Sequence, residues 1–158
     1  VYITRMRTQS RQCGIILHPT SFPSPFGIGD FGQEARETLI KLAQAGVSLW
    51  QVFPLGPTGY GDSPYSARST FAGNEYLIDL RSIPGCNLPP DYSSRTANVN
   101  YVEVYEHKFA MLKQVASDYY ASYSKDKDFT KFCKNNSWWL DDYALYMAIC
   151  KLHHKIVF

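Results

Sequence analysis

The residues best suited to chemistry lie between positions 50 and 74, where a short apolar run leads into a stretch of Gly, Pro, Ser, Tyr and Asp. Tyr60, Ser63 and Tyr65 combine aromatic rings with hydroxyl groups on a backbone stiffened by glycine and proline. Sugars are bound by such a set, because their C–H faces pack on rings and their hydroxyls need hydrogen-bond partners. The spacing fits equally well a structural role, in which the aromatic rings only cover the open end of a barrel.

Two other groups of titratable residues are weaker candidates for catalysis. His18 follows one apolar run and Asp62 follows another, so the two could meet as a base and its orienting group. We favour local roles instead, with His18 satisfying loop backbone and Asp62 accepting from turn N–H groups. Asp141 and Asp142 are neighbours on a predicted helix and point about 100° apart, so they cannot form a facing carboxylate pair.

A glycine pattern at Gly27, Gly29 and Gly32 formally matches a dinucleotide-binding fingerprint. In that fold the glycines follow the strand directly, whereas residues 18–26, including three prolines, intervene here. The context therefore disfavours a nucleotide site.

The elements that must position these residues begin with a strand, a helix and a second strand. The apolar run 13–17 predicts a buried strand, and the breaker-rich loop 18–30 follows it. Helical spacing predicts a helix over 31–46, with Asp30 before it as a start signal, and another apolar run predicts a strand over 49–55. This order is typical of a βαβ unit in a parallel sheet.

The second half of the chain is predicted to be mainly helical. A possible third strand spans 76–80, and the turn-like residues 84–101 lack periodicity. A long helix is predicted from Tyr101, followed by shorter helices at about 128–133 and 138–153. A sheet this small cannot be covered on both faces by such helices, so the pattern indicates part of a barrel with a helical insertion.

We therefore divide the chain into a tail (1–10), a βαβ part with the substrate loop (11–81) and an inserted helical subdomain (82–158) that looks truncated at its carboxyl end. Because the chain opens on Val1, Met6 is a candidate for the biological start. A formal net charge of +2 with scattered Lys and Arg disfavours nucleic acid as a partner. No stretch predicts a membrane span or a signal peptide, so we expect a soluble, cytoplasmic protein. The cysteines lack zinc or disulfide spacing, which predicts reduced thiols and no metal site: Cys13, Cys86, Cys133 and Cys150.

Two long motifs resemble the amino-terminal part of the 4-alpha-glucanotransferases, also called amylomaltases or disproportionating enzymes. They are GIILHPTSFPSPFGIGDFG at 14–32 and WQVFPLGPTGYGDSPYSARSTFAGN at 50–74, and the similarity returns in the WWLDDYALYMAI wording that ends at residue 149. The resemblance implies an α/β fold, a (β/α)8 barrel with inserted helices that is incomplete in this chain. It also implies transfer of α-1,4-glucan segments by a retaining mechanism with two carboxyl groups, without a metal or organic cofactor.

By the same resemblance, Tyr65 packs beside the sugar to be transferred, Ser63 contacts the glucan near the cleavage point and Tyr60 is an outer stacking residue. Asp62 and Asn74 hold the loop in shape. In the family the catalytic carboxylates lie on later barrel strands, so we assign no catalytic residue to this chain. The implied activity is that of a 4-alpha-glucanotransferase of which this chain is an inactive amino-terminal portion. The alternative is a truncated, non-catalytic glucan-binding module.

The sequence departs from the usual family wording at Ala67, Arg68 and Glu75, where a serine, an aromatic residue and a proline are more common. Arg68 adds charge near the glucan path, so no expectation about preferred chain length follows from the resemblance.

Overall fold

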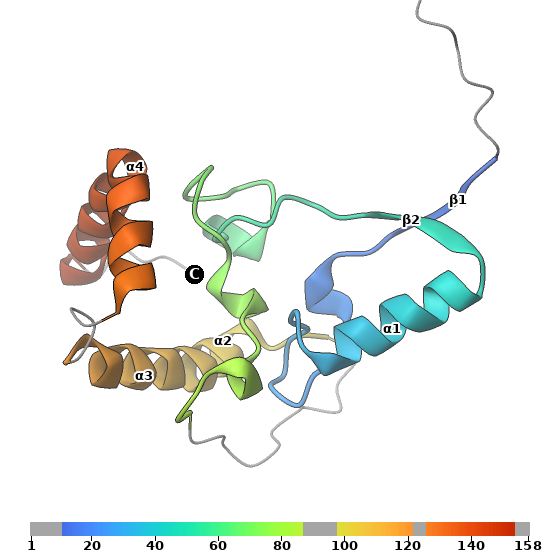
Figure 1. The fold of residues 1–158 in the computed structure, drawn as a ribbon, viewed down its shortest axis with the longest axis horizontal. Coiled ribbons are helices and arrows are strands. Elements are labelled where there is room, and N and C mark those ends of the chain that lie inside the picture. The colour runs from blue at the N-terminus through green and yellow to red at the C-terminus, as the bar shows by residue number, and fades with distance from the viewer. Residues whose placement is uncertain (1–10, 87–97, 122–125, 154–158) are drawn as a thin grey trace, which may run out of the picture.

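The computed structural model describes residues 11–86, 98–121 and 126–153, and the account below concerns these residues (Figure 1). The predicted tail, with Met6, lies outside them. So does much of the segment predicted to be irregular.

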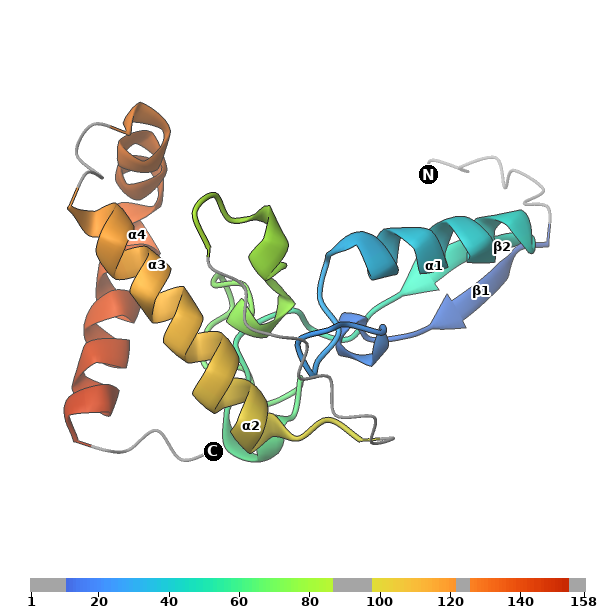
Figure 2. The same cartoon turned by 90° about the horizontal axis from the view of Figure 1, so that it is seen from below.

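The predicted βαβ unit is present, but the prediction that its first strand is buried is wrong, because β1 is mostly exposed in this chain. Strand β1 (Cys13–Ile16) pairs in parallel with β2 (Val47–Gln51), and helix α1 (Gln33–Gln44) connects them. Figure 2 shows α1 lying along this pair of strands. Gly46, in the left-handed region at φ 89°, turns the chain from the helix into β2. The second strand ends earlier than predicted, ahead of Pro54, since proline has no N–H to donate to a ladder.

Two predictions around this unit are wrong. The N-cap of α1 is Gly32 rather than Asp30. The expected third strand over 76–80 is replaced by two 3₁₀ turns, η3 (Glu75–Leu77) and η4 (Leu80–Ser82). The side chains of the residues preceding the turns, Asn74 and Asp79, accept hydrogen bonds from backbone N–H groups at 2.9 Å and 3.0 Å. Such side-chain bonds favour a turn over an extended strand.

The helical half begins with α2 (Tyr101–Val104), a π-helical stretch, η5 (Tyr105–Phe109), and α3 (Ala110–Tyr120). Helix α4 (Lys127–Leu152) is continuous, so the prediction of two short helices is wrong. Residues 135–137 lie between the two predicted helices. Two of them bond to carbonyls of the preceding turn, Asn136 Nδ2 to Phe132 O at 2.8 Å and Ser137 Oγ to Lys134 O at 3.3 Å.

Helices α3 and α4 lie at the opposite end of the molecule from the βαβ unit, and the long loop after β2 lies between them (Figures 1 and 2). The sheet has two strands among the residues described. None of the described helices is both long and apolar enough to span a membrane.

A buried ion pair joins the loop of the βαβ unit to the helical half of the chain. Lys108, on η5, is fully buried, and its Nζ lies 3.5 Å from Oδ2 of Asp30, which is 1% exposed. The same Nζ donates to the carbonyl of Tyr76 at 2.7 Å. Asp30 also accepts from Gly32 N at 2.9 Å and from Ser24 Oγ at 3.3 Å. Asp30 therefore anchors the loop before α1 to the helical half, which explains why it does not cap the helix.

The glycine pattern has a role in packing. A Cβ at Gly29 would lie 2.2 Å from the carbonyl oxygen of Pro19, and one at Gly32 would lie 2.6 Å from Oδ1 of Asp30. The space beside Gly29 is filled by backbone of the loop after β1, and the space beside Gly32 is filled by the side chains of Asp30, Asp79 and Arg81.

Candidate functional site

The loop that follows β2 folds as an irregular hairpin. Thr58 and Ala67 form an antiparallel bridge, and Arg68 N donates to Pro57 O at 2.9 Å. Gly59 has no room for a side chain, because a Cβ there would lie 2.5 Å from Ser66 O. We call residues 57–68 the hairpin.

Short-range bonds fix the tip and base of this hairpin. Gly61 and Asp62 are both left-handed, at φ 68° and 51°, which turns the chain sharply at the tip. Ser66 N donates to Ser63 O at 3.0 Å, and Asn74 N donates to Leu55 O at 2.9 Å. The hairpin is thus held at both ends, and its side chains project from a defined backbone.

Aromatic rings line up where the two parallel strands end. His18 follows β1 and stacks on Phe53, which follows β2, with ring centroids 5.9 Å apart. Phe53 in turn packs against Tyr65 at 5.8 Å. The carboxyl ends of parallel strands are the usual place for a ligand in α/β folds. One side of the hairpin therefore stands over the position where such a site is expected.

The residues predicted to bind substrate stand on the outer surface of the hairpin. Tyr60 and Tyr65 are 79% and 73% exposed, and Ser63 is half-buried with its Oγ accepting from Tyr65 N at 3.3 Å. Two large exposed rings on one short hairpin offer flat stacking faces. Their assignment to substrate remains a prediction.

The residues predicted to shape the loop have local partners. Asn74 is buried and accepts from Tyr76 N at 2.9 Å, while Thr58 bonds to the carboxylate of Asp62. Burial raises the pKa of Asp62, and the bond from Thr58 opposes that rise. His18 and Asp62 have separate partners, since Nδ1 of His18 lies 2.7 Å from Thr20 Oγ1. The local interpretation of both residues fits this arrangement better than a catalytic pair does.

The imidazole of His18 is buried just after the end of β1, at the start of the loop that follows it. Its Nε2 makes no hydrogen bond of standard geometry with the residues described. Burial lowers the pKa of His18 below 6.5, and the nearby carbonyl of Pro54 offsets this only in part. Burial therefore favours the uncharged form of this imidazole, which stacks on Phe53.

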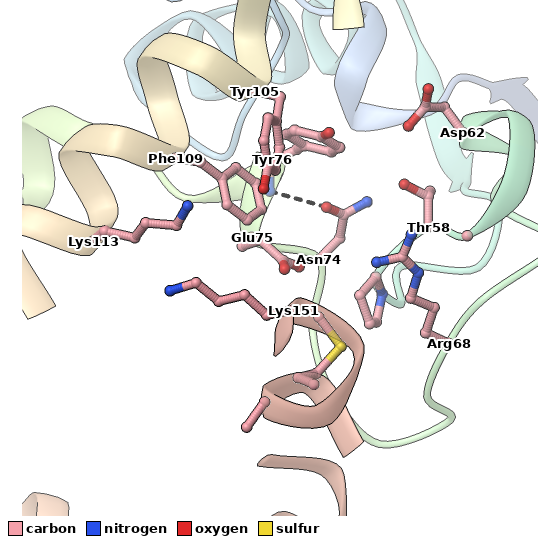
Figure 3. Close-up of a pocket in the computed structure, with 14 residues that line it drawn as sticks. Thr58, Asp62, Arg68, Asn74, Glu75, Tyr76, Tyr105, Phe109, Lys113 and Lys151 are labelled. Atoms are coloured by element: carbon pink, nitrogen blue, oxygen red, sulfur yellow. Dashed lines mark hydrogen bonds between the residues drawn. The ribbon is translucent and has the colours of Figure 1, made fainter. Parts of the chain in front are cut away.

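A cavity of about 260 Å³ lies behind the hairpin, between it and the helices (Figure 3). Asp62 and Asn74 line it, whereas Tyr60, Ser63 and Tyr65 do not. Sequence reasoning missed the residues that α3, η5 and α4 contribute to its wall. They are Tyr105, Phe109, Lys113, Met147, Ala148 and Lys151. The i, i+4 spacing of Tyr105 and Phe109 marked a helix face, but nothing local indicated what that face would meet.

Charged groups of both signs surround this cavity. Figure 3 shows Glu75 on the wall beside Asn74, with Lys113 and Lys151 reaching in from the helices. Burial raises the pKa of Glu75 above its ordinary value. The ammonium of Lys113 lies 5.4 Å from the ring centre of Tyr105, within range of a cation–π contact.

The same wall is tied to the buried ion pair. Lys108 donates to the carbonyl of Tyr76, and the N–H of Tyr76 donates to the side chain of Asn74. Both backbone groups of Tyr76, the residue that follows the loop, are therefore hydrogen-bonded. Across the three described stretches, no group of three His, Cys, Asp or Glu side chains is placed to hold a metal ion. All four cysteines are free thiols.

Comparison with known proteins identifies relatives of this chain. The family profile described as 4-alpha-glucanotransferase matches residues 17–157. The 4-alpha-glucanotransferase of Thermus thermophilus is 46% identical over 147 residues, which are 90% of this chain and 29% of that protein. The chloroplastic/amyloplastic enzyme of Solanum tuberosum is 39% identical over 152 residues, 88% of this chain and 26% of its own length.

A solved structure agrees with these relatives. The amylomaltase from Streptococcus agalactiae in complex with acarbose superimposes with a TM-score of 0.75 at 29% identity, covering 90% of this chain and 30% of that one. The chain thus spans less than a third of the length of these relatives. The family profile covers most of the chain, and the chain therefore belongs to the 4-alpha-glucanotransferase family.

Proposed function

We propose that this chain forms the amino-terminal part of a 4-alpha-glucanotransferase and that its hairpin binds the α-1,4-glucan. The observation that carries the proposal is the pair of exposed rings, Tyr60 and Tyr65, on a bonded hairpin at the carboxyl ends of β1 and β2. Family membership and the acarbose complex of the Streptococcus agalactiae relative support this ligand class.

In this proposal Tyr65 packs beside the sugar to be transferred. Its ring is backed by Phe53, and Phe53 is backed by His18, so the stacking face is held in place. Ser63 supplies a hydroxyl to the glucan near the cleavage point, and Tyr60 stacks on a more distant sugar. Asp62 and Asn74 keep the hairpin in shape through their bonds to Thr58 and Tyr76.

The reaction proposed for the whole enzyme is a retaining double displacement. A carboxylate attacks the anomeric carbon and forms a glycosyl-enzyme, while a carboxylic acid protonates the leaving oxygen. The deprotonated acid then takes the proton from the 4-hydroxyl of an acceptor sugar, whose oxygen attacks the anomeric carbon and releases the carboxylate. We place both carboxyl groups outside this chain, which contributes binding and positioning. The alternative, a glucan-binding module without catalysis, makes the same contacts and lacks the transfer step.

Calorimetric titration with maltotriose and maltohexaose tests the binding part. We expect Tyr65→Ala to weaken binding of both about fivefold to tenfold, because an aromatic contact is lost. Tyr60→Ala should weaken maltohexaose binding more than maltotriose binding. Tyr120→Ala is the matched control, since Tyr120 is 69% exposed on α3 and lines none of the cavities described above. Unchanged affinities in both hairpin variants would remove the assignment.

Incubation with maltotriose tests the catalytic part. Disproportionation of maltotriose releases glucose, and we expect none from this chain alone. Glucose formation above the level of a heat-treated control would contradict our placement of the carboxylates.

A further inference from the structure

The loop after β1 begins with a 3₁₀ turn, η1 (Pro19–Ser21), that is held firmly in place. Gly29 N donates to Thr20 O at 3.0 Å. A Cβ at Gly29 would lie 2.2 Å from Pro19 O, so a larger residue there would collide with the turn. The second glycine of the sequence pattern therefore anchors Thr20 by close backbone contact.

Two donors of this turn converge on one nitrogen of His18. Thr20 Oγ1 lies 2.7 Å from Nδ1 of His18, and the backbone N–H of Thr20 donates to the same atom at 3.4 Å. A backbone N–H can only donate, so Nδ1 must be the unprotonated, accepting nitrogen of the ring. Nε2 therefore carries the proton, and the carbonyl of Pro54 is an acceptor near the ring. Thr20 thus selects one tautomer of His18 and restrains its side chain.

The imidazole of His18 supports the aromatic rings that lead to the hairpin. Its plane lies at 16° to that of Phe53, and the plane of Phe53 lies at 46° to that of Tyr65. His18 is 6% exposed, whereas Tyr65 is 73% exposed. The rings therefore run from a buried, hydrogen-bonded residue to one that faces solvent. A change in the orientation of the imidazole would alter the surface against which Phe53 and Tyr65 pack.

Resting on the proposed function of the hairpin, we propose that Thr20 is a positioning residue for glucan binding. Its hydroxyl holds the imidazole of His18 against Phe53, and Phe53 holds Tyr65 at the angle at which its ring stacks on a sugar. Thr20 acts through these rings and contacts no sugar. Its contribution is preorganisation, because a ring that is already oriented loses less conformational freedom when the ligand binds.

Substitutions at Thr20 separate the hydroxyl from the rest of the side chain. In calorimetric titration, Thr20→Val should weaken maltotriose binding about threefold, an effect in the range of one lost hydrogen bond. Thr20→Ser keeps the hydroxyl and should bind like the wild type. Thr38→Val is the matched control, since Thr38 Oγ1 donates to Glu34 O at 2.7 Å within α1. A loss in Thr20→Ser as large as that in Thr20→Val would assign the effect to packing and overturn the inference.

A double variant tests whether Thr20 acts through Tyr65. Maltohexaose is the ligand here, because Tyr60 can still stack on it when Tyr65 is replaced. In the Tyr65→Ala background, Thr20→Val should cause no further loss of affinity, since the ring that Thr20 positions is gone. Equal losses from Thr20→Val with and without the Tyr65 ring would show that Thr20 acts elsewhere, which contradicts the inference.

The imidazole signals of His18 provide a readout that a purely structural role would not move. The chain has four histidines, and His18→Gln assigns the relevant signals in a long-range ¹H–¹⁵N NMR spectrum. The wild type should show the tautomer protonated at Nε2, and the Nδ1 signal should move in Thr20→Val. Maltotriose should shift the His18 signals in a saturable way in the wild type and leave them unchanged in Tyr65→Ala.

The outcomes distinguish this inference from the proposed function. If Tyr65→Ala weakens binding and Thr20→Val does not, the hairpin keeps its assignment and the role of Thr20 is overturned. If neither variant weakens binding, both are overturned. If Thr20→Val does not fold, as judged by far-ultraviolet circular dichroism, the wild-type spectra decide. A tautomer protonated at Nδ1, or His18 signals that ignore bound maltotriose, would then overturn the inference.

Discussion

Replacing Lys108 by methionine should destabilise this chain far more than removing a surface charge. Methionine fills a similar volume, so the change isolates the loss of the ammonium group. Lys108 is fully buried and Asp30 is 1% exposed, so the variant leaves a carboxylate buried without its countercharge. Breaking a buried pair in this way costs about 3–5 kcal/mol. Asp30 keeps its bonds from Gly32 and Ser24, which places the expected cost towards the lower end of that range.

The double variant Asp30→Asn, Lys108→Met removes both charges together. What remains is the carbonyl of Tyr76 without its donor, a loss of about 1–3 kcal/mol. The double variant should therefore be more stable than Lys108→Met alone, although it carries one more substitution. Glu34→Gln is the control, because its bond from Arg81 at 2.8 Å joins side chains that are 30% and 27% exposed. A half-exposed pair contributes at most about 1 kcal/mol.

Urea unfolding followed by circular dichroism measures these differences as changes in the free energy of unfolding. Domains are stable by only about 5–15 kcal/mol, so the single variant could lose its cooperative transition altogether. Recovery of that transition in the double variant would then be the informative result. A cost below 1 kcal/mol for Lys108→Met, or a double variant less stable than the single one, would refute the reasoning.

The remaining predictions concern backbone space, pH and the sheet. Gly29→Ala should cost several kcal/mol in urea unfolding, because its Cβ would lie 2.2 Å from a backbone oxygen, whereas Gly73→Ala has open space and should be neutral or slightly stabilising. The pKa of His18 is lowered in the folded state, so stability should fall as pH drops below 6.5, where the unfolded chain takes up a proton first. His18→Gln should lose less stability between pH 7 and pH 5 in matched melts, and parallel curves would contradict this. Ile16 and Leu49, 60% and 50% exposed on the two strands, should make the chain self-associate, which light scattering would detect. A sharp, reversible melt from a monomer would speak against that expectation.

The parts of the fold that could be predicted from sequence are those with local signals. The βαβ unit follows from two apolar runs, a helical period and Gly46, all within a short stretch. The false strand over 76–80 had a local counter-signal too. Asn74 and Asp79 each precede a turn that their own side chains cap, and such residues favour turns over strands. The strand was predicted because the apolar residues of 76–80 were given more weight than these two capping residues.

The candidate site also has a part that local sequence signals predict and a part that they do not. The exposed tyrosines of the hairpin stand out in the sequence because glycine, proline and aromatic residues alternate there. Part of the wall of the cavity comes from helices far along the chain, and nothing near Tyr105 in the sequence indicates what its side chain faces. A site built across elements needs the tertiary contacts before it can be seen.

The buried pair explains why those contacts depend on one another. Asp30 lies at the end of the loop after β1 and Lys108 lies on η5. The carbonyl that also accepts from the ammonium belongs to Tyr76 on η3, after the loop that follows β2. The same three segments also share the buried apolar cluster of Ile28, Tyr76 and Val104, so the cation and this cluster together hold them in place. Because a buried charge tolerates little displacement from its partners, the helical half cannot move freely against the hairpin. The position of η5 against the loop that follows β1 is thus fixed by contacts that lie outside the hairpin.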